Sequence, residues 1–280
     1  MKITRYIFLS LLVAAILSAC AKHDFFDETV ITGNVGPQAY WEIGSATVSA
    51  GADMPFVAQY YSTVADIDRS EVWYDVIETV DKTVSCPWVV STTYSISSVQ
   101  SAEKRISQKI QEYPHSLAVW SDSLHAYVLT DKFPVSGTLS TLSWVNPAVF
   151  DSVKMETYFG TGYMQQFKDS LRDNVMKYAD YKNMMLGLGL LSNFSQYTDS
   201  TFDANSNGWV YHFPEDANGN TPVPADVRDL YESIPFDRLI GGASGYNVSY
   251  KRSYSMNAIL RVYDKRGVYG TTVSKAIDIN

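Results

Sequence analysis

The chain has 280 residues, a formal net charge of −8 at pH 7 and 46% hydrophobic residues. An acidic chain repels phosphate backbones, so no nucleic acid is expected as a partner. The length and the apolar content are sufficient for one large domain or two ordinary domains, each with a sizeable core.

The first twenty residues have the parts of a secretory signal peptide. Lys2 and Arg5 give a short positive segment, and Ile7–Leu17 form an apolar run that is shorter than the roughly 20 residues of a spanning helix. The run ends in the tetrad LSAC, which closes on Cys20 and has the form of a lipobox. We therefore predict that residues 1–19 are a lipoprotein signal peptide and that Cys20 carries the lipid, including acyl chains such as palmitate.

Residues 20–38 are polar and are predicted to hold the lipid anchor and a tether. The basic-then-acidic run of residues 21–28 resembles the export tag of Bacteroidetes surface lipoproteins. The resemblance implies attachment to the outer membrane, and it leaves open whether the chain faces the cell surface or the periplasm. If Cys20 is lipidated, Cys86 has no disulfide partner and is expected to be a buried small hydrophobe.

Residues 39–94 are predicted to form the first half of an antiparallel β-sandwich. The β-rich run Met54–Ser62 follows a turn signal, and a second run, Glu71–Ile77, alternates apolar side chains. Short strands separated by turns are typical of immunoglobulin-like sandwiches.

Residues 95–240 are predicted to be a mixed α/β insertion or a second domain. Ala102–Ile110 is compatible with either a helix or a strand. Leu117–Trp120 and Ala126–Leu129 are expected to pair as strands. Phe167–Tyr178 carries apolar residues every three or four positions, which predicts an amphipathic helix.

Residues 241–280 are predicted to close the sandwich with strands at Tyr246–Tyr250, Ser255–Tyr263 and Thr271–Ile279. Asp264–Gly267 has the composition of a hairpin turn with glycine where a positive φ is needed. This ending resembles the closing strands of immunoglobulin-like and polycystic-kidney-disease-like modules in bacterial surface proteins. The predicted fold class is therefore mainly β with an α insertion (α+β).

One segment has the spacing of a calcium-binding loop. Asp203, Asn205 and Asn207 follow the pattern D-x-N-x-N-G, in which alternate oxygens converge on one cation. The same composition is typical of ordinary turns, so both interpretations stay open. No other cofactor is predicted, and the sequence contains no H-E-x-x-H, C-x-x-C, G-x-S-x-G or P-loop motif.

Aromatic side chains are the remaining candidates for ligand binding, because Trp and Tyr have a flat apolar face and a polar edge. The four candidate tryptophans are Trp88, Trp120, Trp144 and Trp209, with Tyr158, Phe159 and Tyr163 as further aromatic candidates.

The organisation of lipobox, tether and sandwich resembles the accessory lipoproteins of TonB-dependent, starch-utilisation-type uptake systems. The resemblance implies a non-enzymatic lipoprotein that captures a nutrient, either a glycan or a peptide, or that assembles with an outer-membrane uptake channel. Two alternatives stay open. One is an adhesion or scaffold module that binds another envelope protein, and the other is a hydrolase whose site is assembled from distant residues.

Overall fold

The computed structural model describes residues 35–280 apart from 93 and 244. The chain is mostly β, with antiparallel sheets and few helices, which confirms the predicted predominance of strands. The signal peptide and the lipidated Cys20 are predictions that lie outside the described residues. Within the described part of the chain, no helix has the length and apolarity needed to cross a bilayer.

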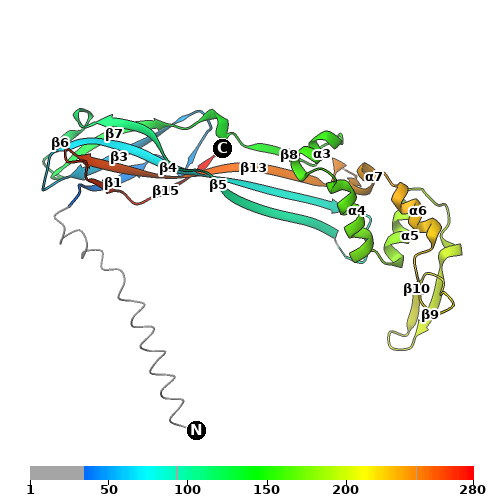
Figure 1. Cartoon of the computed structure of the whole chain (residues 1–280). Coiled ribbons are helices and arrows are strands. Elements are labelled where there is room, and N and C mark those ends of the chain that lie inside the picture. Colours follow the sequence, from blue (N-terminus) through cyan, green and yellow to red (C-terminus); the bar gives the residue numbers. More distant parts are fainter. Residues whose placement is uncertain (1–34, 93, 244) are drawn as a thin grey trace, which may run out of the picture. The chain divides into compact units, whose positions relative to one another are not determined.

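The chain divides into two compact units, which are described separately (Figure 1). Unit 1 comprises the described residues up to Asp75 together with Arg105–Ser136 and Met256–Ile277. Three long strands, β4 (Ile67–Cys86), β5 (Tyr94–Pro114) and β13 (Val248–Asp264), supply residues to both units. The shorter elements of unit 1 are β1 (Gln38–Ile43), β2 (Thr47–Val48), β3 (Asp53–Tyr61), the 3-10 helix η1 (His115–Leu117), β6 (Val119–Ser121), β7 (Ala126–Pro134), β14 (Tyr269–Thr271) and β15 (Lys275–Ile279).

Unit 1 contains a four-stranded sheet with the order β1-β3-β7-β6, whose neighbouring strands are antiparallel. Its inward side chains alternate along β3, where Met54, Phe56, Ala58 and Tyr60 are all buried. This alternation is the pattern of a strand with one face on a core.

The second sheet of unit 1 belongs to a larger sheet with the order β2-β15-β13-β4-β5. The two sheets contact each other through Phe56 of β3 and Tyr113 of β5, whose ring centroids lie 5.3 Å apart. The Tyr113 hydroxyl also donates to the carbonyl of Lys132 on β7 at 2.8 Å. Aromatic burial of this kind contributes roughly 1.5–3 kcal/mol per fully buried side chain, so the contact between the sheets is a main source of stability.

Unit 2 comprises Val76–Lys104 and Gly137–Ser255, with the last three residues of the chain. It is the helical part of the chain, and it also contains two small two-stranded sheets. Its elements are the 3-10 helix η2 (Gly137–Leu139), β8 (Leu142–Val145), α3 (Ser152–Phe159), α4 (Tyr163–Asn174), α5 (Tyr178–Gly187), the 3-10 helix η3 (Ser195–Tyr197), β9 (Asp199–Asp203), β10 (Gly208–His212), α6 (Ala225–Ser233), α7 (Phe236–Ile240), β11 (Gly241–Gly242) and β12 (Gly245–Tyr246), with parts of β4, β5 and β13.

The core of unit 2 is built from buried side chains of its helices and of β4, β8 and β13. Phe167 and Leu171 supply the apolar face of α4, as the sequence predicts, and Met184 and Met185 supply that of α5. Met side chains fill irregular gaps because they have three rotatable bonds, which suits a core made of short helices.

A buried carboxylate holds the start of α5 to the loop after β4. Asp180 is fully buried, and it accepts hydrogen bonds from the backbone of Val90, Ser91 and Lys177 and from the Ser91 hydroxyl, at 2.8–3.0 Å. Burial alone would raise the pKa of Asp180, but these donors outweigh it and hold the pKa below its ordinary value. Asp180 is therefore charged at neutral pH and connects two segments of unit 2.

The predicted domain boundaries differ from this division. The predicted insertion, 95–240, contains β6 and β7, which pair in the four-stranded sheet of unit 1. Residues 241–255, predicted to belong to the closing strands, lie in unit 2. The reason is that long strands pair by backbone hydrogen bonds along their whole length, and such pairing leaves no trace in local composition.

Three predicted elements also change their bounds. Ala102–Ile110, which was compatible with a helix or a strand, lies within β5. The predicted helix Phe167–Tyr178 is α4, which begins earlier and ends at Asn174, because Val175 leaves the helical conformation. The predicted strand Ser255–Tyr263 and most of the predicted strand Tyr246–Tyr250 form one continuous strand, β13, while Tyr246 belongs to β12.

We expect Asp180→Ala to lower the free energy of unfolding by about 2–4 kcal/mol, because it leaves several buried donors without an acceptor. Because the pKa of Asp180 is lowered by folding, its contribution is present above the unfolded pKa and is lost as the pH falls through the folded pKa. Urea unfolding at neutral pH and below about pH 4 measures both effects. The exposed Asp229→Ala is the control, and an equal loss in both variants would contradict the role of Asp180.

Candidate functional site

A hollow with a volume of about 820 Å³ lies in unit 1. The β3–β4 loop forms one side, the residues around η1 form another, and the β13–β14 turn adds one cation. Hydroxyl groups, carboxylates and aromatic rings are therefore present together at its surface. The lining consists of Ser62, Thr63, Val64, Ala65, Asp66, Ile67, Asp68, Pro114, His115, Ser116, Tyr127 and Lys265.

An aromatic cluster stands on one side of this hollow. Tyr127 of β7 packs edge-on against His115, with ring centroids 4.3 Å apart, and against Trp120 of β6 at 5.0 Å. The pairing of β6 with β7 sets this geometry, because Trp120 lies directly opposite Tyr127. Trp120 is 46% exposed, and its indole N–H donates to Asp122 at 2.8 Å, which fixes the ring.

The polar atoms of this cluster are held uncharged. Burial lowers the pKa of His115 and raises the pKa of Tyr60, which packs beside it, to about 12. At neutral pH the imidazole and the phenol are therefore neutral. The buried Nδ1 atom of His115 has no hydrogen-bond partner among the described residues. Such an atom is costly to leave unpaired.

The charges of the hollow are paired. Lys265 Nζ lies 3.0 Å from an oxygen of Asp66, and the Lys265 backbone N–H donates to the Asp66 carbonyl at 2.9 Å. Asp68 accepts from Arg69 at 2.8 Å. These pairs are largely exposed, so each contributes little to stability. They do, however, fix the β3–β4 loop against the β13–β14 turn.

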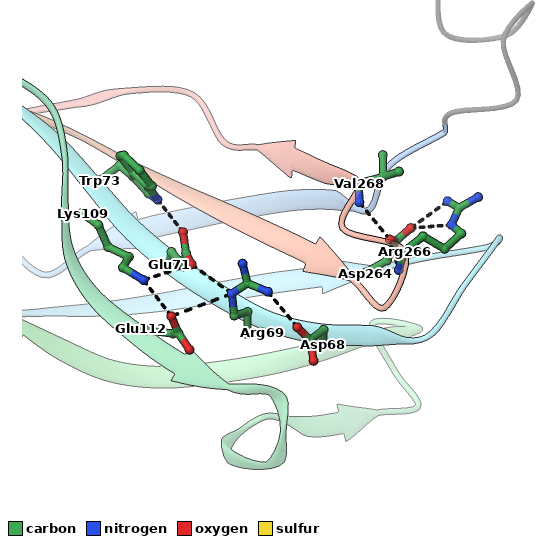
Figure 2. A network of polar contacts seen from close by, with 9 residues as sticks. All are labelled: Asp68, Arg69, Glu71, Trp73, Lys109, Glu112, Asp264, Arg266 and Val268. Atoms are coloured by element: carbon green, nitrogen blue, oxygen red, sulfur yellow. Dashed lines mark hydrogen bonds and ion pairs between the residues drawn. The ribbon is translucent and has the colours of Figure 1, made fainter.

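Arg69 is positioned by a buried carboxylate, Glu71, on the same strand, β4 (Figure 2). Glu71 accepts from Arg69 Nε at 2.9 Å, from the indole of Trp73 at 2.8 Å and from Lys109 at 3.4 Å. Burial alone would raise the pKa of Glu71, but these three donors hold it below its ordinary value. The network therefore ends at Asp68, which lines the hollow.

The turn that presents Lys265 is held by a second carboxylate. Asp264 is buried, and it accepts from the backbone N–H groups of Arg266 and Val268 and from the Arg266 guanidinium (Figure 2). The turn closes with Gly267 at φ 82°, a conformation that favours glycine. The predicted turn 264–267 is confirmed, and the structure adds its role of placing a cation at the hollow.

Two arginines on the same face of the sheet lie over aromatic rings. Arg69 lies 4.3 Å from the ring centroid of Tyr263, and Arg261 lies 4.0 Å from that of Trp73. Stacked guanidinium groups of this kind contribute about 0.5–1 kcal/mol at exposed sites. Sequence reasoning missed both contacts and the Glu71 network. The only available signal was the row of polar residues at alternate positions of a strand.

The other candidate tryptophans belong to unit 2. Trp144 is buried in β8 and packs edge-on against Tyr158 at 5.8 Å, while Phe159 and Tyr163 pack half-buried against the same core. Trp88 donates its indole N–H to the carbonyl of Arg238 at 3.1 Å. Trp88 also lines a separate hollow of about 450 Å³ in unit 2. Of the predicted set, Trp120 packs on Tyr127, which lines the hollow of unit 1, but Trp120 is not itself part of that lining.

Trp209 and the predicted calcium loop occur together in the β9–β10 hairpin of unit 2. Asp203 accepts from the backbone N–H of Asn205 and from the hydroxyl of Ser206, at 2.9 and 2.8 Å. Asn207 has a φ of 49°. The segment thus forms the hairpin turn, with the carboxylate of Asp203 engaged inside it. Among the described residues, no group of three His, Cys, Asp or Glu side chains is placed to hold a metal ion. Calcium binding by Asp203, Asn205 and Asn207 stays a prediction.

Comparisons with known proteins give no relative. No family model matches the chain, and no curated protein or solved structure is significantly similar to it.

We expect Glu71→Gln to lower the free energy of unfolding by about 1–3 kcal/mol, because a neutral amide cannot accept from all three donors of the network. Glu112→Gln is the matched control, since Glu112 contacts the same Arg69 and Lys109 but is half exposed, and its expected cost is below about 1 kcal/mol. Urea unfolding of each variant measures its free energy of unfolding. Because folding lowers the pKa of Glu71, the difference between wild type and Glu71→Gln should narrow below about pH 4. Equal costs in the two variants would contradict the structural role of Glu71.

Proposed function

We propose that this chain is a lipid-anchored protein of the outer membrane that captures a nutrient, a glycan or a peptide, in the hollow of unit 1. The observation that carries the proposal is the aromatic cluster of Trp120, Tyr127 and His115 beside a polar hollow of about 820 Å³. Binding sites for small polar ligands combine aromatic surfaces with a few placed polar groups.

The hollow matches the chemistry of a hydroxylated ligand. A sugar ring has an apolar face that packs on an aromatic ring, and its hydroxyl groups both donate and accept hydrogen bonds. Tyr127 and the ring of His115 supply the aromatic contact, and Ser116 supplies a hydroxyl. Both carboxylates of the hollow have cationic partners, which supports binding rather than acid–base catalysis.

The proposal extends to the architecture and to the partners. The contact between the two antiparallel sheets of unit 1 supports an immunoglobulin-like sandwich. The lipobox ending at Cys20 supports attachment to the outer membrane, and an uptake channel in that membrane is the proposed recipient of the ligand.

We expect the full-length chain, purified in detergent, to bind members of a panel of neutral glycans and short peptides, with a change in tryptophan fluorescence. Trp120→Ala should weaken this binding by about tenfold or more, because truncating a well-packed aromatic anchor typically costs more than about 1.4 kcal/mol.

Trp144→Phe is the matched control, since Trp144 is buried in unit 2 and Phe keeps its apolar contacts. Its binding should equal that of wild type. Equal binding by wild type and Trp120→Ala would contradict the part that the aromatic cluster plays in the proposed site. The absence of any ligand in the panel would favour the alternative, an adhesion or scaffold module, and a pull-down from outer membranes would then identify the partner.

The anchor has its own test. Cys20→Ser should move the protein from the membrane fraction to the soluble fraction and abolish labelling with a radioactive fatty acid, because an oxygen cannot replace the lipidated thiol. Cys86→Ser is the control and should keep both the label and the membrane location, since Cys86 is buried. Labelling of the Cys20→Ser variant would contradict the predicted lipobox.

A further inference from the structure

The β9–β10 hairpin of unit 2 carries exposed aromatic side chains on one face. Trp209 lies opposite Phe202, and their rings pack edge-on with centroids 5.5 Å apart. Tyr211 lies two residues further along β10 on the same face. Trp209 is 61% exposed and Tyr211 is 57% exposed. A protein that exposes large aromatic residues side by side has a surface suited to binding.

This face is fixed to the core of unit 2 at one end. Phe213, the next residue of the same alternation, is buried and packs edge-on against Tyr178 and Tyr181 of α5 at 5.3 and 5.7 Å. The other end of the hairpin is closed by the turn at Asp203. Phe202, Trp209 and Tyr211, which we call the aromatic strip, are therefore held in place from both ends of the hairpin. Trp209 and Tyr211 are two positions apart along β10, which corresponds to roughly 7 Å.

A cation and a second hollow adjoin this strip. The ammonium of Lys182, on α5, lies 5.9 Å from the ring centroid of Tyr211. Lys182 also lines a hollow of about 420 Å³ together with Asn193, Ser195 and Thr198. No carboxylate lies within 4.0 Å of Lys182 among the described residues. In an acidic chain, an unpaired cation beside aromatic rings and hydroxyl groups selects for an anionic partner.

We propose that the aromatic strip and the adjoining hollow form a second ligand site, which takes an acidic saccharide. The apolar faces of successive sugar rings pack on Trp209 and Tyr211. A carboxylate of the sugar pairs with Lys182, and the amide and hydroxyl groups of the hollow bind sugar hydroxyls. This proposal is independent of the one for unit 1. Trp209 belongs to this site and Trp120 to the cluster in unit 1, so a substitution can abolish binding at one site without affecting the other.

The test uses the full-length chain in detergent, with an α-1,4-linked trisaccharide of galacturonic acid and the corresponding neutral galactose trisaccharide as probes. Titration calorimetry should show tighter binding of the acidic probe, and added salt should weaken that binding. Trp209→Ala should weaken binding of the acidic probe about tenfold or more. Lys182→Gln should remove the preference for the acidic probe and most of its salt dependence.

Two control variants test whether binding of the acidic probe belongs to this strip. Val210→Ala changes the opposite face of the same strand, and Trp120→Ala changes the hollow of unit 1, so both should bind the acidic probe as wild type does. Circular dichroism confirms that each variant is folded. Failure of wild type to bind the acidic probe, or equal binding by Trp209→Ala, would overturn the proposal. Sedimentation showing a dimer that Trp209→Ala dissociates would also overturn it, because the strip would then be occupied by a second copy of the chain.

Discussion

The burial of one negative charge constrains the candidate site more than any other interaction. A carboxylate in an apolar environment is costly unless cations and hydrogen-bond donors surround it. Glu71 meets that requirement with Arg69, Trp73 and Lys109, which come from two adjacent strands. Satisfying Glu71 fixes the orientation of Arg69, and Arg69 in turn fixes Asp68 at the edge of the hollow. The position of a surface residue therefore follows from the electrostatics of a buried one.

The two units use aromatic residues for two purposes. Rings such as Phe56 and Tyr113 join the sheets of unit 1, and Phe167 and Tyr181 fill the core of unit 2. Other rings of the same types are exposed, namely Trp120 beside Tyr127 in unit 1 and Phe202, Trp209 and Tyr211 on the β9–β10 hairpin of unit 2. Burial of apolar area explains the first set, because it is the dominant favourable contribution to folding. It does not explain the second set, on which the two proposed ligand sites are based.

Part of the site could be predicted from the sequence, and part could not. Trp120 was a candidate because tryptophan combines a flat apolar face with a polar edge, and the strand pair around it is confirmed. The remaining members of the site, Asp66, His115 and Lys265, are widely separated in the chain and meet only through strand pairing. None of them belongs to a motif. The long strands β4, β5 and β13 also supply residues to both units, whereas the predicted domain boundaries were based on changes in local composition.

The sequence alone determined the predominance of strands, the turn at Gly267 and the apolar face of α4, because each depends on local periodicity or on backbone freedom. It also provides the whole argument for a lipid on Cys20, which lies outside the described residues. Only the tertiary structure decided which tryptophans are buried, which hydrogen bonds the Asp203 carboxylate accepts and which charged residues surround the hollow. These depend on contacts between distant segments, and a single sequence contains the residues that make such contacts but not their pairing.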